Sequence, residues 1–250
     1  GWRSNLRKFD RVTPDKTDTN NYGAVSTDYI GHSDAWPEAD YATRERIFQE
    51  HVTYQQGLMW FQVHDPAVPD DVREQMAQWG LCRDEFQATG GWPHQIYVRE
   101  GRRMVSDYVI TEHDCRGDAK AEDSVGLASY TMDSHNCQRF VRDGRVLNEG
   151  DVQVPSKSPY PVPYRSIVPS AGQCENLLVP VCLSASHIAF GSVRMEPVFM
   201  ILSQSAATAA ALAIDAGVAV QQVDYPTLRK QLESQRQLLE YVKPEPAAKW

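Results

Sequence analysis

Four side chains in two short segments could move protons or stabilise a negative charge. The segment "YTMDSHN" contains Asp133 and His135, two positions apart in a stretch whose pattern predicts a strand. Residues two apart on a strand share a face, so the carboxylate could orient the imidazole for proton transfer. His187 and Arg194 flank Gly191 just before a long uncharged run, where a cation could stabilise charge on a bound group.

Each of these residues also has a purely structural interpretation. A lone histidine in a strand, such as His135, is more often part of the packing than of a reaction. Arg194 could be paired with Glu196 or Glu100 and serve only to neutralise it.

A second set of residues could bind a substrate. Arg99, Arg102 and Arg103 lie within five residues and could hold an anionic or polyhydroxylated ligand, or they could form ion pairs at a domain interface. Tyr130 and Tyr164 could line a carbohydrate-sized pocket, although tyrosines are ordinary on half-buried strands.

The elements that must position these residues follow from periodicity and turn signals. Apolar residues at steps of three and four predict helices over residues 38–80, with a new start at Pro69. Residues 90–165 predict several strands, including 95–98 and 105–111, with turns at Gly144 and Gly150. The apolar run Leu177 to Leu183 predicts another strand. The expected fold class is α+β (mixed α/β), with a mixed sheet.

A long helix is predicted from Pro197 to just before Gly217, because proline suits a first turn and glycine suits the residue past the end. Small residues recur along it at steps of three and four, so one face could closely approach a backbone or a planar ligand. Its N-terminus favours an anionic or electron-rich group. Close packing on a sheet would explain the same face equally well.

Composition narrows the classes of function. The 250 residues include 33 acidic and 25 basic ones, a formal charge of −8, and no cluster of five basic residues, so we expect no nucleic-acid partner. Five cysteines without a C-x-x-C pair favour free thiols over disulfides or a metal site. We also expect no signal peptide and no membrane span, because the uncharged run 197–214 is short and rich in Ser, Thr and Ala. The sequence does not indicate a compartment.

Several motifs in a fixed order closely resemble the C-terminal half of the FAD-dependent oxidoreductase family often labelled xanthan-lyase-like. They are "IYVREGRRMVSDYVITEHD", "ASYTMDSHN", "PYPVPYRSIVP" and "ENLLVPVCLSASHIAFGSVRMEPVFMILSQSAATAAALA". The resemblance implies a substrate-side domain at residues 1–165, a returning segment of the FAD-binding domain at 166–217, and a C-terminal helix and tail at 218–250.

The same resemblance implies how the site is built. The start of the alanine-rich helix would lie beside the flavin, with cofactor contacts from six residues: Ser192, Arg194, Met195, Ser203, Ser205 and Ala206. His135, supported by Asp133, would act on the proton of the substrate, while His187 or Arg194 would stabilise the reduced flavin. We expect His135, His187 and Arg194 to converge on one cavity.

The sequence departs from the family pattern at its best-known motif. It contains no G-x-G-x-x-G, and Ser203 stands where the family usually has glycine. We therefore expect a substrate-side portion that oxidises a C–OH or C–N bond together with an N-terminal FAD-binding domain. Alone, it would bind FAD weakly or not at all and would tend to pair with a second copy.

Two other functions stay open at this point. A polysaccharide lyase would use a Tyr or His base with an Arg that neutralises a uronate, and it would need no flavin. A non-catalytic carbohydrate-binding domain would use only the arginines and tyrosines.

Overall fold

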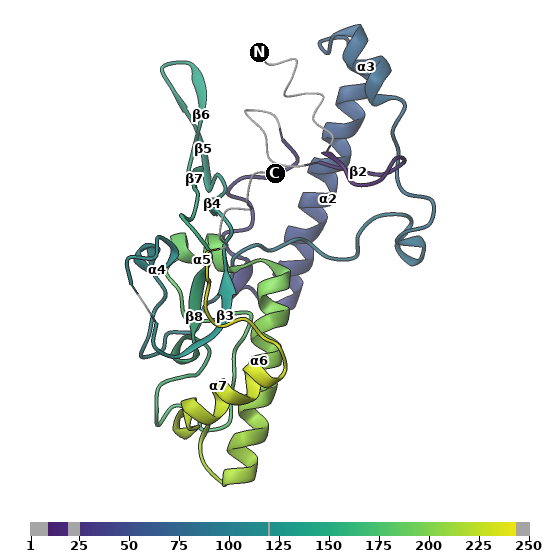
Figure 1. Ribbon diagram of the computed structural model, residues 1–250. Coiled ribbons are helices and arrows are strands. Elements are labelled where there is room, and N and C mark those ends of the chain that lie inside the picture. Colours follow the sequence, from purple (N-terminus) through teal and green to yellow (C-terminus); the bar gives the residue numbers. More distant parts are fainter. Residues whose placement is uncertain (1–9, 20–25, 120, 244–250) are drawn as a thin grey trace. The chain divides into compact units, whose positions relative to one another are not determined.

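The chain folds into two compact units, each with its own buried core. The computed structural model describes residues 10–19, 26–119 and 121–243. Unit 1 comprises Gly1–Val98 and His135–Asp151, and unit 2 comprises Arg99–Ser134 and Val152–Trp250 (Figure 1). Helices occur beside small antiparallel sheets, so the predicted α+β class is confirmed. The three-part functional division at residues 165 and 217 stays a prediction.

Unit 1 is built around the long helix α2 (Tyr41–His64) and the short α3 (Asp70–Met76). Asp40 caps α2, because its side chain accepts a hydrogen bond from the Thr43 backbone N–H at 2.8 Å. Its small core joins the two helices through Val68, Val72 and Met76. The predicted helices at 38–80 are therefore confirmed in outline, with a break at 65–69.

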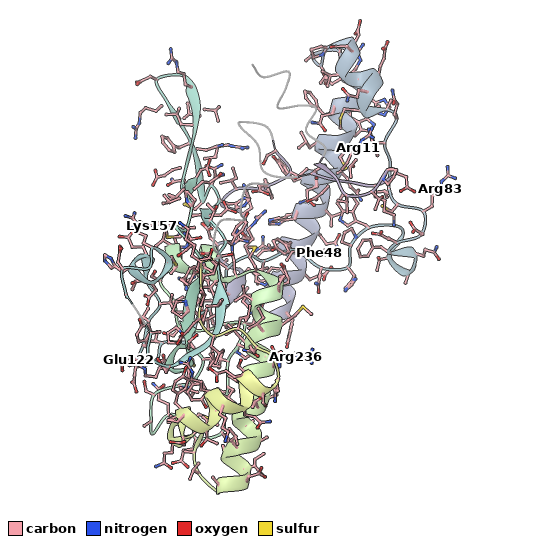
Figure 2. All side chains as sticks on the ribbon, in the orientation of Figure 1. Arg11, Phe48, Arg83, Glu122, Lys157 and Arg236 are labelled. Carbon is pink, nitrogen blue, oxygen red and sulfur yellow. The ribbon has the colours of Figure 1, made fainter. Side chains whose placement is uncertain are left out.

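The remaining elements of unit 1 are short. They are β1 (Asp10–Arg11), β2 (Thr17–Asp18), the 3-10 helices η1 (Trp36–Glu38) and η2 (Gln87–Thr89), and the hairpin β5 (Gln138–Arg142) with β6 (Arg145–Glu149). Asp143 and Gly144 both have positive φ and make the hairpin turn, as the sequence predicts for Gly144. Side chains project from both sides of this hairpin (Figure 2).

Unit 2 contains two further antiparallel pairs. β3 (Ser124–Ala128) pairs with β8 (Tyr160–Pro163), and β4 (Met132–Ser134) pairs with β7 (Val152–Val154). Asp133 faces Gln153 in the second pair. The proline-rich segment continues from β8 into the 3-10 helix η3 (Tyr164–Ser166).

The helices of unit 2 are α4 (Glu112–Cys115), α5 (His187–Val193), α6 (Glu196–Ala216) and α7 (Tyr225–Ser234), with the 3-10 helix η4 (Val220–Gln222). One apolar cluster joins residues of β3, β4, β8 and all four α-helices. α7 lies against α6, and α6 lies against β3 (Figure 1). α6 begins one residue before Pro197 and ends at Gly217, whose φ is +65°, so its predicted limits are confirmed.

The small residues of α6 allow this helix to pack closely against strand β3. A Cβ on Gly126 in β3 would lie 2.5 Å from the Ile201 side chain, and the Ser205 hydroxyl donates to the Val125 carbonyl at 2.6 Å. Ala206 and Ala209 are buried on the same face. The sheet-packing alternative thus accounts for the buried side of α6, while Ser203 and Ala207 are exposed.

By length and composition, α6 is the one helix in the described ranges that could cross a membrane, with a mean hydropathy of 1.6 over the tested window. The expectation that this run is too short and too polar is therefore wrong by these two criteria. A third of that window is buried inside the protein, against β3 and the core of unit 2.

Three of the expected β-structures do not form in the described residues. Residues 95–98, 105–111 and 177–183 contain no strand; Ile110 makes a single parallel bridge with Ala185. The run at 177–183 contains Pro180, which has no N–H, and its neighbours bond to separate segments: Val179 donates to Ile167, and Cys182 accepts from Met104. Instead of one mixed sheet, the described strands form four antiparallel pairs.

Candidate active site

Strand β4 and helix α5 pack together in unit 2 and bring several polar residues to one place. Gly191 in α5 makes this possible, because a Cβ there would lie 2.6 Å from the Asp133 carbonyl oxygen. The helix backbone therefore rests directly on the strand. Two side chains at the ends of α5 reach β4. His187 is the first residue of the helix, and Arg194 follows its last residue. We call this set, with Asp133 and Ser134, the β4–α5 site.

Arg194 and Asp133 form a largely buried ion pair in this site. The Arg194 Nη2 donates to Asp133 Oδ2 at 3.1 Å and to the Asp133 carbonyl at 3.3 Å. The two side chains are 5% and 13% exposed. The Arg194 Nε is also buried and has no hydrogen-bond partner among the described residues. The partner of Arg194 is thus neither Glu196 nor Glu100, and one guanidinium donor stays unsatisfied, which is costly in a buried site.

His187 is held at both ring nitrogens. Its Nδ1 lies 2.7 Å from Glu100 Oε2, and its Nε2 lies 3.0 Å from Ser134 Oγ. Arg103 binds the same Glu100 oxygen at 2.8 Å and donates through Nε to the Ala185 carbonyl. The His187 side chain is 58% exposed, so solutes can reach its ring.

His135 lies in unit 1, where its Nδ1 is 3.4 Å from Asp28 Oδ2. Both side chains are largely buried, at 18% and 20% exposed. Asp28 is thus a carboxylate beside His135, and Asp133 binds Arg194; the support of His135 by Asp133 stays a prediction. Because His135 and the β4–α5 site belong to different units, their convergence on one cavity stays a prediction.

The six residues predicted to contact a cofactor divide into two groups. Ser192, Ser205 and Ala206 are buried within unit 2, and both hydroxyls are engaged inside it. Met195 is half-buried and Ser203 is exposed. Three of the six residues therefore have something to offer a ligand. Arg194 has an unsatisfied donor, and Met195 and Ser203 have accessible surface.

Ser192 belongs to a buried polar cluster behind the site. The Tyr160 hydroxyl donates to Ser192 at 2.7 Å, and Ser192 donates to the Tyr130 carbonyl at 2.5 Å. Burial raises the pKa of Tyr160 and that of the nearby Cys115 thiol, so both stay protonated at neutral pH. The cluster ties β8, α5 and the segment before β4 together.

The predicted substrate residues differ in their exposure and in their partners. Tyr164 is 5% exposed, and its hydroxyl donates to the Val220 carbonyl at 2.8 Å, so it lies in the core and not on a pocket wall. Tyr130 is 42% exposed. Arg103 is committed to Glu100, Arg99 is half-buried, and Arg102 is exposed.

Within the described ranges, no group of three or more His, Cys, Asp or Glu side chains is placed to hold a metal ion. The five cysteines are free, with Cys115 buried and Cys137 and Cys182 exposed.

Sequence reasoning missed three partners that define these contacts: Asp28, Glu100 as the partner of His187, and Ser134. Glu100 was visible as the one acid among three arginines, and Ser134 as the neighbour of Asp133 in the DSH motif. Asp28 had no local signal, because 107 positions separate it from His135.

Comparison with known families supplies an independent finding. A family model described as FAD dependent oxidoreductase matches residues 2–232. Neither the curated proteins nor the solved structures gave a match.

Proposed function

Because the chain belongs to the FAD dependent oxidoreductase family, we propose that it forms the substrate-side portion of such an enzyme and oxidises a C–OH or C–N bond by hydride transfer to flavin. One observation carries the proposal: Arg194, two residues before the first residue of α6, is buried with an Nε donor that has no partner among the described residues. A buried cationic donor without a partner favours an electron-rich group beside it.

The start of α6 supports the proposal of a flavin site. Met195, the N-cap residue of this 21-residue helix, makes no side-chain capping hydrogen bond, so the first-turn N–H groups have no side-chain cap at the positive end of the helix. When bound, FAD supplies the two-electron acceptor for the oxidation. Arg194, Met195 and Ser203 would hold it on this side, and Ser192, Ser205 and Ala206 would support that surface from the core.

The remaining contacts to FAD are proposed to come from a FAD-binding domain. The sequence has no G-x-G-x-x-G to cradle a pyrophosphate. α6 also presents an outer face on which Met200 and Ile214 are 73% and 79% exposed. We propose that this domain covers that face, and that the substrate is a small molecule, with carbohydrates among the candidates.

In this proposal His135 accepts the proton of the substrate and Asp28 stabilises the imidazolium, the role that the sequence assigned to Asp133. His135→Ala should lower turnover by roughly two to four powers of ten, the contribution of a positioned base, and leave flavin content unchanged. The test is made on the enzyme completed by its FAD-binding domain and loaded with flavin, with an alcohol or amine identified by its reduction of the flavin. It compares His135→Ala with the matched variant His94→Ala, whose histidine is exposed. Turnover at the parental rate would refute the assignment.

A further inference from the structure

We propose that Glu100 is a positioning residue that fixes His187 with its Nδ1 protonated and its Nε2 as a proton acceptor beside Ser134. The inference rests on the proposed function only for the identity of the reaction that would use this acceptor. Its geometry is a chain of contacts within unit 2, from Ser134 through His187 and Glu100 to Arg103.

The Glu100 carboxylate decides which ring nitrogen carries the hydrogen. An ionised carboxylate can only accept, so the His187 Nδ1, 2.7 Å away, must donate. In the neutral imidazole, Nε2 then has the lone pair, and the Ser134 hydroxyl at 3.0 Å donates to it. This tautomer is the less common one for histidine free in water, so the protein must impose it.

Arg103 holds the Glu100 carboxylate in place. Its Nη1 binds the same Oε2 atom, its Nε donates to the Ala185 carbonyl two residues before His187, and its guanidinium lies 5.5 Å from the centre of the Phe190 ring. Glu100 is 19% exposed at its side chain, which limits competition from water.

This arrangement suits proton transfer better than covalent catalysis. Ser134 is 3% exposed and is too enclosed to attack a substrate carbon, whereas the His187 ring is 58% exposed. A hydroxyl of a bound molecule, other than the one that His135 deprotonates, could replace Ser134 as the donor to Nε2. Its O–H bond would break, the proton would form an Nε2–H bond, and the imidazolium would pair with the Glu100 carboxylate.

The test is the tautomer of His187, measured by long-range nitrogen–proton NMR on the 15N-labelled protein at a pH where the ring is neutral. The signals of the seven histidines are assigned with His187→Gln. We expect a protonated Nδ1 in the parent and in Ser134→Ala. Glu100→Ala should lose this preference, and Glu100→Asp should retain it in part.

Glu112→Ala is the matched control, because this exposed carboxylate pairs with Arg116 in the same unit and should leave His187 unchanged. A protonated Nε2 in the parent, or an unaltered tautomer in folded Glu100→Ala, would overturn the proposal. If Glu100→Ala does not fold, Glu100→Met removes both acceptor oxygens and keeps a similar size; an unaltered His187 tautomer in folded Glu100→Met would equally overturn the proposal. No flavin or turnover enters this measurement, so a fully active His135→Ala enzyme would refute the proposed function and leave this result standing.

Discussion

At the level of single residues, the candidate site depends on one largely buried pair of charges. Arg194 and Asp133 neutralise each other, so Arg194 contributes less net positive charge to a ligand than an isolated cation would. What it retains is a directed donor, the unpartnered Nε. Its contribution to ligand binding would therefore come mainly from hydrogen bonding.

Arg194→Met should lower the free energy of unfolding by about 3–5 kcal/mol, because it leaves the largely buried Asp133 carboxylate without its cation. Denaturant titration measures this loss. Arg46→Met is the control: its pair with Glu50 is exposed, and it should cost less than about 1 kcal/mol. Adding Asp133→Asn to Arg194→Met should recover part of the stability. A loss for Arg194→Met as small as that of the control would contradict the prediction.

Tyr108 gives the protein a specific sensitivity to alkaline pH. Burial and the hydrogen bond from its hydroxyl to Asp114 raise the pKa of Tyr108 from 10.0 to about 12. The unfolded chain loses this proton from about pH 10 while the folded chain keeps it. The stabilisation is therefore complete below pH 10 and is lost as the pH rises toward 12.

Tyr108→Phe should consequently be less stable than the parent at neutral pH and should lose less further stability across that window. Urea unfolding below pH 10 and within the window tests this, with Tyr41→Phe, whose ring is exposed, as the control. Equal slopes of stability against pH in the parent and Tyr108→Phe would show that the folded protein does not raise the pKa of this hydroxyl.

At the level of elements, the β4–α5 site depends on how closely a helix can approach a strand. Gly191 does not have a positive φ, so its conformational freedom is not needed here. It matters because the absence of a side chain lets α5 approach β4. A second glycine, Gly126, likewise allows β3 to pack closely against α6. These two contacts hold both ends of the segment that carries Arg194.

Gly191→Ala should destabilise the protein by about 1–3 kcal/mol, because the new methyl group forces α5 away from the Asp133 backbone. Gly57→Ala in α2 is the matched comparison: nothing lies within 4 Å of the position that its new Cβ would take, so better helix propensity should add about 0.5–1 kcal/mol. Thermal or denaturant unfolding distinguishes them. Opposite signs are expected, and two stabilised variants would show that α5 can shift at no cost.

At the level of the whole molecule, the distribution of core residues differs between the units. The large apolar cluster of unit 2 includes residues from its strands and its four α-helices. The described apolar cluster of unit 1 has three buried residues, Val68 before α3 and Val72 and Met76 within it, with Val63 of α2 packed against them. The β4–α5 site therefore stands on the better-packed unit. A well-packed unit holds the Arg194–Asp133 ion pair and the His187–Glu100 hydrogen bond in fixed positions.

The 250-residue chain should retain little flavin by itself, because its sequence has no glycine-rich pyrophosphate cradle. Gel filtration of the protein after incubation with FAD, followed by the absorbance spectrum of the protein peak, measures this. Flavin absorbance in a one-to-one ratio with protein would contradict the prediction and would require a binding site outside the start of α6.

Local signals in the sequence determined the elements whose limits are set by neighbouring residues. Pro197 and Gly217 mark the two ends of α6, and Gly144 lies in the β5–β6 turn. The helical periodicity of residues 38–80 predicted α2 and α3. Such features depend on backbone geometry and on the spacing of apolar residues along one segment. The sequence therefore predicted the fold class and the long helix well.

The tertiary structure alone decided which charges meet. Spacing along a strand suggests that Asp133 supports His135, which stays a prediction, but it does not suggest that Asp133 also binds Arg194, 61 positions away, or that His135 meets Asp28. Glu100 reaches His187 across 87 positions. A carboxylate binds whichever cation the packing brings within about 3–4 Å, and that choice depends on contacts such as Gly191 on β4, which no local pattern encodes.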